Sequence, residues 1–239
     1  MVEYSFVIPV YNEEDNILSL NDEIQEAVRR IDEPCEVIWV DDGSSDKSLH
    51  IIRQLIKAHG QYRFISFERN YGQSAALAAG FHAAAGKYII TMDSDRQNDP
   101  MDILRMIPYL AKYDMVTGWR KERYDTGWKK FSSRFANSVR NRLSRETIKD
   151  TGCSLKIMKT VYVKKLKMYK GLHRFLPTLM KMEGAAVIEV PVGHRPRTKG
   201  ASKYGTWDRA FSGLRDLLAV RWMQDRTISY KIKEASDEH

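Results

Sequence analysis

YSFVIPVYNEEDNILSLNDEIQEAVRRIDEPCEVIWVDDGSS, residues 4–45, contains two short apolar runs on either side of a longer amphipathic stretch. The runs Tyr4–Val10 and Glu36–Val40 are continuous, which is typical of strands covered on both faces. Between them, residues 17–31 place an apolar side chain every three or four positions, which predicts a helix that ends before Pro34. The stretch therefore predicts a strand–helix–strand unit.

The same alternation continues to about residue 118 and predicts an α/β fold with a mostly parallel sheet flanked by helices. Ser45 is expected to cap the second helix and Gly60 to end it. In such sheets, ligands bind outside the carboxyl ends of the strands. We expect further strands at 64–67, 88–92 and 115–118, and further helices over 49–56, 74–85 and 100–113.

Polar clusters stand at the expected carboxyl ends of three strands. They are Tyr11-Asn12-Glu13, Asp41-Asp42-Gly43 and Asp93-Ser94-Asp95. Each cluster alone could be ordinary turn chemistry, because Asp, Asn and Ser favour turns and helix caps. Three clusters on one edge instead favour a ligand site.

The third cluster, Asp93-Ser94-Asp95, follows the apolar run YIITM, and Gln97 comes two residues later. Two carboxylates on a tight turn can share a hard divalent cation. Mg²⁺ usually binds through one or two carboxylates together with substrate phosphates. The pattern therefore indicates Mg²⁺ or Mn²⁺ and a phosphorylated substrate.

The net charge of +8 is divided unevenly along the chain. Residues 1–119 hold 11 Lys and Arg against 19 Asp and Glu, whereas residues 120–239 hold 28 against 12. Acidic groups suit a bound metal, and basic groups suit phosphates or an anionic surface. Two basic stretches carry apolar stripes at helical spacing, with members at 128, 131, 135, 139 and 143 and at 207, 211, 214, 218 and 222. Such helices lie in a membrane interface or pack with a solvated basic face, and both readings stay open.

Several other chemistries lack their sequence signatures. The chain has no Gly-x-x-x-x-Gly-Lys phosphate loop, no Gly-x-Gly-x-x-Gly after the first run, no His-Glu-x-x-His and no Gly-x-Ser-x-Gly. The six histidines have no ligand spacing, so we interpret them as surface or internally bonded residues. Cys35 and Cys153 indicate free thiols in a reducing compartment. Neither a secretory leader nor a run of about 20 apolar residues is present.

Six ordered strings carry a family resemblance. They are VIPVYNEE (7–14), VDDGSSD (40–46), ERNYGQSAALAAGF (68–81), MDSDRQNDP (92–100), DTGCSLKIMK (150–159) and EVPVGHRPRTKGASKYG (189–205). In the first four the chain resembles glycosyltransferase family 2. In the last two it resembles the polyisoprenyl-phosphate branch, which includes dolichol-phosphate mannose synthase, undecaprenyl-phosphate formamido-arabinose transferase and bactoprenol glucosyltransferases. The likeness implies a GT-A fold over residues 1–222, with a nucleotide-sugar half (1–119), an acceptor- and membrane-facing half (120–222) and a polar tail (223–239).

The resemblance also implies roles for individual residues. Arg120 and Arg134 would face the phosphates of donor or acceptor, and Arg197, Ser202 and Lys203 would bind phosphate from a loop over the site. Asp93, Asp95, Arg134 and Arg197 would form the catalytic set, with Asp95 and Gln97 on the metal. The donor would be bound by Pro9, Tyr11, Glu13, Val40, Asp42, Asp93, Ser94, Asp95, Gln97 and Arg120.

The implied function is metal-dependent, inverting transfer of a sugar from a GDP- or UDP-linked sugar to a polyprenyl phosphate. An acceptor phosphate is mostly dianionic at neutral pH and needs no strong base. We expect a cytoplasmic protein held peripherally on the cytosolic membrane face, with a separate membrane-spanning partner possible and no nucleic-acid partner. The alternatives are a soluble family 2 enzyme acting on a hydroxyl, with a base from the loop after Asp150, and a basic module that binds membranes or nucleic acid.

Two features depart from the family pattern. Arg96 stands where relatives commonly carry an apolar residue between the second aspartate and Gln97. Many relatives continue into transmembrane helices after the segment that corresponds to Asp216-Leu217-Leu218, whereas this chain has only a polar stretch there.

Overall fold

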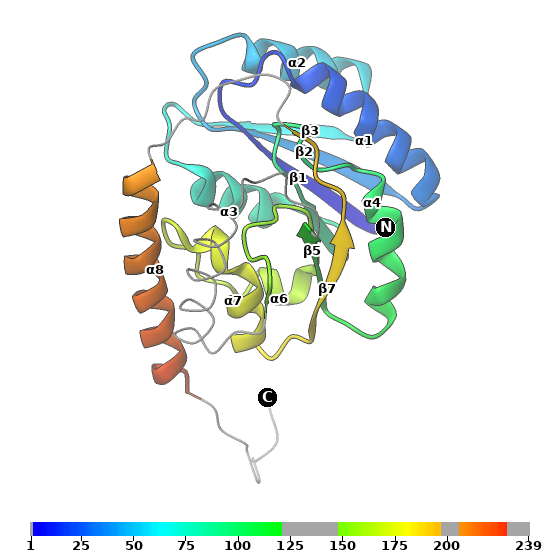
Figure 1. Ribbon diagram of the computed structural model, residues 1–239. Helices are drawn as coiled ribbons and strands as arrows, with labels where there is room; N and C mark the ends of the chain where they lie inside the picture. Colours follow the sequence, from blue (N-terminus) through cyan, green and yellow to red (C-terminus); the bar gives the residue numbers. More distant parts are fainter. Residues whose placement is uncertain (1, 121–147, 197–205, 229–239) are drawn as a thin grey trace, which may run out of the picture.

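The computed structural model describes residues 2–120, 148–196 and 206–228, with the backbone alone for residues 206–212. The described strands form one seven-stranded sheet in the order β3-β2-β1-β4-β6-β5-β7 (Figure 1). All neighbours are parallel except β6, which runs antiparallel to both β4 and β5. The strands are β1 (Tyr4–Val10), β2 (Cys35–Asp41), β3 (Tyr62–Ser66), β4 (Tyr88–Thr91), β5 (Met115–Arg120), β6 (Lys156–Lys159) and β7 (Val187–Val192).

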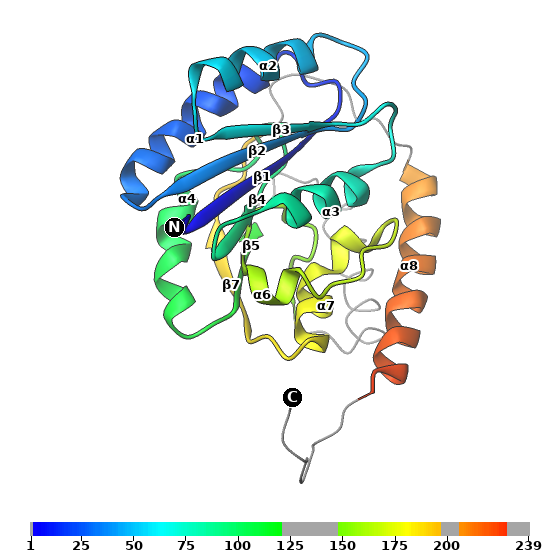
Figure 2. The same cartoon turned by 180° about the vertical axis from the view of Figure 1, so that it is seen from behind.

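Helices cover both faces of the sheet, as the alternation of strands and helices predicts (Figure 2). One face carries α1 (Ile17–Ile31), α2 (Ser48–Ala58), α4 (Asp102–Met106) and the 3-10 helix η1 (Ile107–Ala111). The other carries α3 (Gln73–Ala83), α6 (Thr160–Val163) and α7 (Leu176–Met182), with the 3-10 helix η2 (Leu172–Phe175) just before α7. Helix α8 (Thr206–Arg226) packs on η2 and α7.

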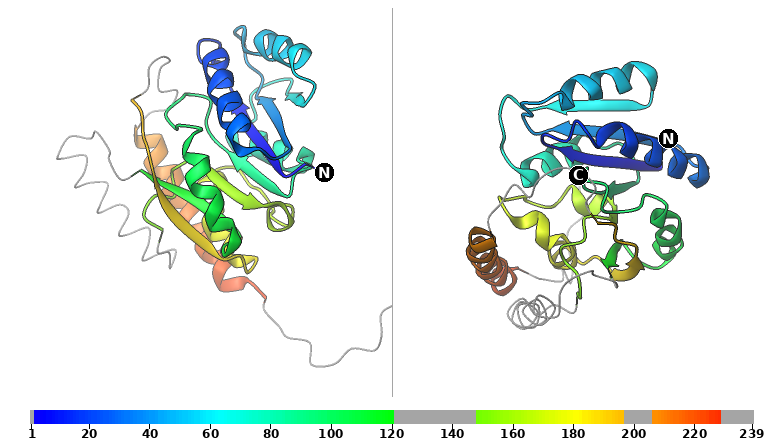
Figure 3. Two further views of the ribbon diagram at one scale, coloured as in Figure 1. Left: turned by 90° about the vertical axis from the view of Figure 1, so that its right-hand side faces the viewer. Right: turned by 45° about the horizontal axis from the view of Figure 1, so that its top comes forward.

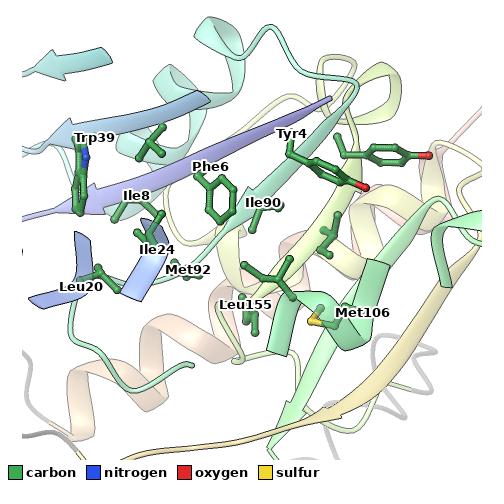
Figure 4. Close-up of a cluster of buried hydrophobic side chains, with 14 of the residues drawn as sticks. Tyr4, Phe6, Ile8, Leu20, Ile24, Trp39, Ile90, Met92, Met106 and Leu155 are labelled. Carbon is green, nitrogen blue, oxygen red and sulfur yellow. The ribbon is translucent and has the colours of Figure 1, made fainter. Parts of the chain in front are cut away.

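The continuous apolar runs form strands because alternate side chains enter two different cores. In β1, Phe6 and Ile8 pack with Trp39 of β2 in the core under α1 and α2 (Figure 4), whereas Val7 packs under α3. Every residue of β1 is buried. Since both faces of a central parallel strand are covered, no polar alternation is needed.

The small residues of α3 let this helix approach the sheet closely. A Cβ atom built on Gly80 would collide with the side chain of Val7 in β1. This contact explains why a helix of such small residues occurs here, since a bulkier residue at position 80 would push α3 away from the strand. The approach also places the N-terminus of α3 beside the carboxyl ends of β1 and β2.

The five strands expected in the first 120 residues are all present, each within two residues of its expected ends. Strands β6 and β7 were not predicted. The helix expected over residues 100–113 is divided into α4 and η1, and Pro108, which lacks a backbone N–H, lies in the 3-10 part. Ser45 does not cap α2, because this helix begins at Ser48 after Lys47 and has no side-chain cap.

Helix α8 lies at the edge of the molecule, outside the sheet and its covering helices (Figure 3). It buries Leu217 and Val220 against η2 and α7. The described side chains of its expected apolar stripe face away from this contact: Leu214 is 48% exposed, Leu218 55% and Trp222 65%. Within the described part of the chain, no helix combines the length and the apolar character that crossing a membrane requires.

Candidate active site

The loops after β1 and β2 are joined by their own polar groups. Asn12, whose φ of 51° is left-handed, receives a hydrogen bond from Ser45 N on its Oδ1 at 2.8 Å. Its backbone N–H donates to Ser44 Oγ at 2.9 Å, and Glu13 N donates to Ser48 Oγ at 2.9 Å. Ser45 therefore ties two loops together instead of capping α2.

Asp42, at the end of β2, organises the loop that leads into α3. Its carboxylate accepts hydrogen bonds from Tyr71 N at 2.7 Å and Gly72 N at 2.9 Å. Burial raises the pKa of Asp42, although these two N–H groups act in the opposite direction. The next residue, Gln73, donates from Nε2 to Asp93 Oδ1 at 2.6 Å. The loop thus connects the carboxylate after β2 to the carboxylate after β4.

Asp93 and Asp95 lie on the turn after β4, which is anchored to the segment before β6. The N–H of Asp93 donates to Ser154 Oγ at 3.1 Å, and this hydroxyl donates to Asn98 Oδ1 at 2.7 Å. Burial and the nearby Asp95 carboxylate raise the pKa of Asp93 to about 6. Two carboxylates this close repel each other, and a cation between them would remove that cost.

Lys156, on β6, brings a buried cation next to these carboxylates. It is only 3% exposed, and its ammonium donates to the carbonyl oxygen of Cys153. Burial lowers the pKa of Lys156, whereas the Asp93 carboxylate acts to raise it. The charges of Lys156 and Asp93 therefore partly balance each other.

These groups line a cavity of about 580 Å³. Carboxylates and the amide of Gln97 lie at the β4 side of this cavity. Four cationic residues, Lys156, Lys170, Arg174 and Arg215, also line it. Such a cavity suits a ligand that carries several phosphates and a metal ion. The other lining residues include Tyr71, Gly72, Gln73, Ser74, Leu77, Thr91, Met92, Thr151, Gly152, Ser154, Gly171, His173, Leu176 and Asp216.

Comparison with known proteins agrees with this geometry. The family model "Glycosyl transferase family 2" matches residues 5–167, more than half of the chain. The chain belongs to glycosyl transferase family 2. Its sheet, helices and rim of carboxylates form the GT-A type of fold.

Two curated relatives of this family 2 chain act on related lipids, as their names state. Dodecaprenyl-phosphate galacturonate synthase from Rhizobium johnstonii is 37% identical, over 92% of this chain and 66% of the relative. Undecaprenyl-phosphate 4-deoxy-4-formamido-L-arabinose transferase from Edwardsiella ictaluri is 35% identical, over 84% of this chain and 62% of the relative. The chain thus spans just under two thirds of the length of these proteins.

Solved structures of glucosyl-3-phosphoglycerate synthase from Mycobacterium tuberculosis share the family 2 fold. One of them, with Mn²⁺, UDP and glucosyl-3-phosphoglycerate, has a TM-score of 0.67 and 19% identity, covering 93% of this chain and 80% of that one. At this identity the likeness shows the fold alone.

The residues that family resemblance assigns to the donor lie along one edge of the sheet. Asp42 and Asp93 are linked through the loop at 71–73, and Asp95 lies on the same turn as Asp93. Tyr11 and Glu13 are half-buried at the end of β1. Pro9, Val40 and Ser94 are buried, and the Val40 side chain packs in the core under α3, so a nucleotide could meet Val40 only through its backbone.

Arg120, at the end of β5, is held by an acidic partner. Its guanidinium makes a bidentate pair with Asp150, with Nε and Nη2 at 2.7 and 2.9 Å from the two carboxylate oxygens. Burial alone would lower the pKa of Arg120, but Asp150 outweighs this effect and raises it. Arg120 also acts electrostatically on Asp93. Its proposed role toward phosphate stays a prediction, and Arg134, Arg197, Ser202 and Lys203 lie outside the described residues.

Arg96, the departure from the family motif, has a structural explanation. Its φ is 60°, in the left-handed region, and its guanidinium pairs with Glu23 of α1 at 2.7 Å. Arg195, after β7, pairs with Glu23 at 2.8 Å and with Asp99 at 2.6 Å. Two arginines thus anchor the turn after Asp95 to α1 and β7.

Sequence reasoning missed the cavity residues contributed by the second half of the chain. Lys156, Lys170, His173, Arg174 and Arg215 all line the cavity, and none was singled out from the sequence. Lys156 lies in the family string DTGCSLKIMK, which is the one sequence signal that could have drawn attention to it. The others reach the cavity only because η2 folds against α3 and α8 packs on η2.

Proposed function

We propose that this protein transfers a sugar from a UDP- or GDP-linked sugar to a polyprenyl phosphate. The carrying observation is the cavity itself, in which Asp93 and Asp95 share one space with Lys156, Lys170, Arg174 and Arg215. The acidic side suits a metal-bound diphosphate, and the cations suit the anionic groups of both substrates. The names of the two polyprenyl-phosphate relatives support the same acceptor class.

The donor would lie across the carboxyl ends of β2, β1 and β4. Tyr11, Glu13 and Asp42, with the backbone of Pro9 and Val40, would bind the nucleoside. The diphosphate would then lie at Ser94 and Asp95, near Arg120. The sugar would then lie toward β6, the strand next to β4, in the cavity.

The residues after β4 fit a hard divalent cation, Mg²⁺ or Mn²⁺. Among the described residues, no three His, Cys, Asp or Glu side chains form a metal-binding group. A site of one or two carboxylates, completed by Gln97 and by diphosphate oxygens, is the arrangement Mg²⁺ prefers. The bound ion would neutralise the charge of the leaving diphosphate. Asp95 and Gln97 would hold it, with Asp93 beside them.

In the reaction, an acceptor phosphate oxygen bonds to C1 of the sugar as the bond from C1 to the diphosphate oxygen breaks. The nucleoside diphosphate leaves with that electron pair, and attack from the opposite face inverts the anomeric centre. The acceptor phosphate is already mostly dianionic at neutral pH, so positioning replaces base catalysis. Lys170, Arg174 and Arg215 would position it, together with Arg134, Arg197, Ser202 and Lys203.

The acceptor implies a place at a membrane, and we propose peripheral attachment on the cytosolic face. The exposed stripe Leu214, Leu218 and Trp222 on α8 supports this, because such a stripe can enter a lipid interface. Arg215, in the same helix, is exposed and lines the cavity mouth. A separate membrane-spanning protein could assist in presenting the lipid.

A panel of UDP- and GDP-sugars, each with Mn²⁺ and undecaprenyl phosphate, tests the proposal. We expect one donor to give a product that is extracted into organic solvent, and EDTA to abolish its formation. Transfer to a hydroxyl-bearing glycan with none to the lipid would instead support a soluble family 2 transferase. Absence of transfer and of donor hydrolysis across the whole panel would overturn the enzymatic proposal.

A further inference from the structure

The cavity has a histidine on the wall formed by η2. His173 is half-buried, and its Nδ1 lies 2.7 Å from Ser74 Oγ, at the start of α3. The N–H of Gly171 donates to the same Oγ at 3.0 Å. A short hydrogen-bonded chain therefore holds the imidazole ring in place.

The same contacts indicate which ring nitrogen carries the proton. Ser74 is 7% exposed, and within the described residues its hydroxyl has only Gly171 N and His173 Nδ1 as partners. Gly171 N must donate to Oγ, which leaves Nδ1 as the acceptor between these two partners for the hydroxyl proton. We therefore assign Nδ1 as the acceptor and the N–H to Nε2.

His173 is a neutral donor at physiological pH. Burial, with the positive charges of Arg174 and Lys156, lowers the pKa of His173 to about 3. Its Nε2–H therefore offers one hydrogen bond without adding charge. Among the described residues, four cationic side chains line this cavity and would be available to phosphate groups. A neutral donor among these cations suits an uncharged or weakly charged oxygen.

We propose that His173 is a specificity-determining residue whose Nε2–H donates to an oxygen of the transferred sugar. The inference rests on the proposed function, in which the transferred sugar would lie in the cavity that His173 lines. A site that donates a hydrogen bond to a particular substrate oxygen discriminates strongly against analogues that lack it. Ser74 is then a positioning residue, since it fixes the ring and its tautomer.

The backbone just before His173 packs closely against α8. Gly171 has a φ of 88°, and a Cβ atom there would collide with the carboxylate of Asp216 in α8. Oδ2 of Asp216 in turn lies 4.0 Å from Nη1 of Arg174. Helix α8 thus supports the segment that presents His173, which links the cavity wall to the helix proposed to contact lipid.

Two ligand pairs that differ only in the sugar test this role. The dissociation constants of UDP and UDP-galacturonate, and of GDP and GDP-mannose, are measured with Mn²⁺ for each variant. For the pair that binds, His173→Ala should weaken the nucleotide sugar by about 2- to 12-fold, the range of one neutral hydrogen bond, and leave the free diphosphate unchanged. Unchanged diphosphate binding also verifies that the variant is folded.

Three further variants sharpen the result. His173→Gln keeps an N–H group on a side chain of similar reach and should recover part of the loss. Ser74→Ala removes the hydroxyl that orients the ring and should cause a smaller loss on the nucleotide sugar alone. His82→Ala, an exposed histidine on α3, should change neither ligand.

Different results would contradict the role of His173 and the proposed function. Equal weakening of UDP and UDP-galacturonate by His173→Ala, or a rise only in the KM for undecaprenyl phosphate, would overturn the role of His173 and leave the proposed function standing. Wild-type protein that binds none of the four nucleotides would overturn the proposed function, and the role of His173 with it.

Discussion

Two parts of the same sheet edge use polar residues in opposite ways. At the ends of β1 and β2, Asn12, Ser44 and Ser48 bind the backbone or side chains of the neighbouring loop. At the ends of β4 and β6, Asp93, Asp95 and Lys156 line a cavity. The sequence shows similar polar clusters in both places. Turn-forming chemistry accounts for much of the first part, whereas the second holds charged groups around a space large enough for a ligand.

The largest expected effect is a loss of turnover, and we expect it only for a substitution on the cavity side. Asp95→Ala removes a carboxylate that faces the cavity, and we expect turnover to fall by at least about a thousandfold with saturating Mn²⁺, because metal stabilisation of the leaving group contributes several kcal/mol. The measurement is the initial rate of lipid-linked product formation.

The matched control is Asp46→Ala, in the loop after β2. Asp46 accepts hydrogen bonds from Glu14 N at 3.1 Å and Ser48 N at 2.9 Å, so its loss should cost about 1 kcal/mol of stability and leave turnover nearly intact. Equal losses of turnover in the two variants would remove the distinction between the parts.

One ion pair on the cavity side is an exception to this contrast, because its two charged groups bind each other. Arg120 and Asp150 have side chains only 18% and 10% exposed. Asp150→Ala leaves an unpaired cation in a mostly buried place, and we expect a loss of about 3–5 kcal/mol in the free energy of unfolding by urea. Glu26→Ala, which breaks an exposed pair with Arg29 on α1, should leave the unfolding midpoint almost unchanged. A similar small effect for Asp150→Ala would show that this pair is not structural.

A third prediction concerns the free energy of unfolding, which the charged Asp93 carboxylate in the cavity is expected to lower. Because the pKa of Asp93 is raised to about 6 from an ordinary value near 4, the folded state holds this proton more tightly than the unfolded chain. The stability that protonation contributes is complete below pH 4 and is lost as the pH rises to 6, by up to about 3 kcal/mol. Asp93→Asn should therefore be more stable than the wild type at pH 7 and about equal at pH 4.

Urea unfolding in EDTA at pH 4, 5, 6 and 7 measures this difference. Asp15→Asn, at an exposed position before α1, is the matched control for the substitution itself. A constant difference for Asp93→Asn would mean that the carboxylate is not destabilised by its surroundings.

The comparison also explains what could be predicted from the sequence. Strands such as β1 and β2 are predictable because both of their faces are buried, which leaves a continuous apolar run. Strand β6 has four residues with Lys156 and Lys159 at its ends, and it pairs with β4, more than 60 residues earlier in the chain. No local sequence pattern predicts that β6 inserts between β4 and β5.

The site divides in the same way. Asp93, Asp95 and Gln97 were predicted because the pattern of a metal-binding turn is contained in one short segment. His173 and Ser74 are 99 residues apart and meet only after η2 folds against α3. The sequence therefore could not show the residues that we infer to contact the sugar, whereas the local motif pointed to those that we propose bind the diphosphate.

The smallest expected effect tests whether the cavity side faces a membrane. On α8, Leu217 is 4% exposed and packs on η2, whereas Trp222 is 65% exposed and has a large apolar ring in solvent. Trp222→Ser should weaken binding to anionic liposomes, measured by flotation, by at least about tenfold, since inserting such a side chain contributes about 1.5–3 kcal/mol, and it should leave unfolding unchanged. Leu217→Ala should do the reverse, lowering stability by about 2–5 kcal/mol because it opens a cavity in the core. If Trp222→Ser floated like the wild type at low salt, the exposed stripe of α8 would have to serve a protein partner instead of lipid.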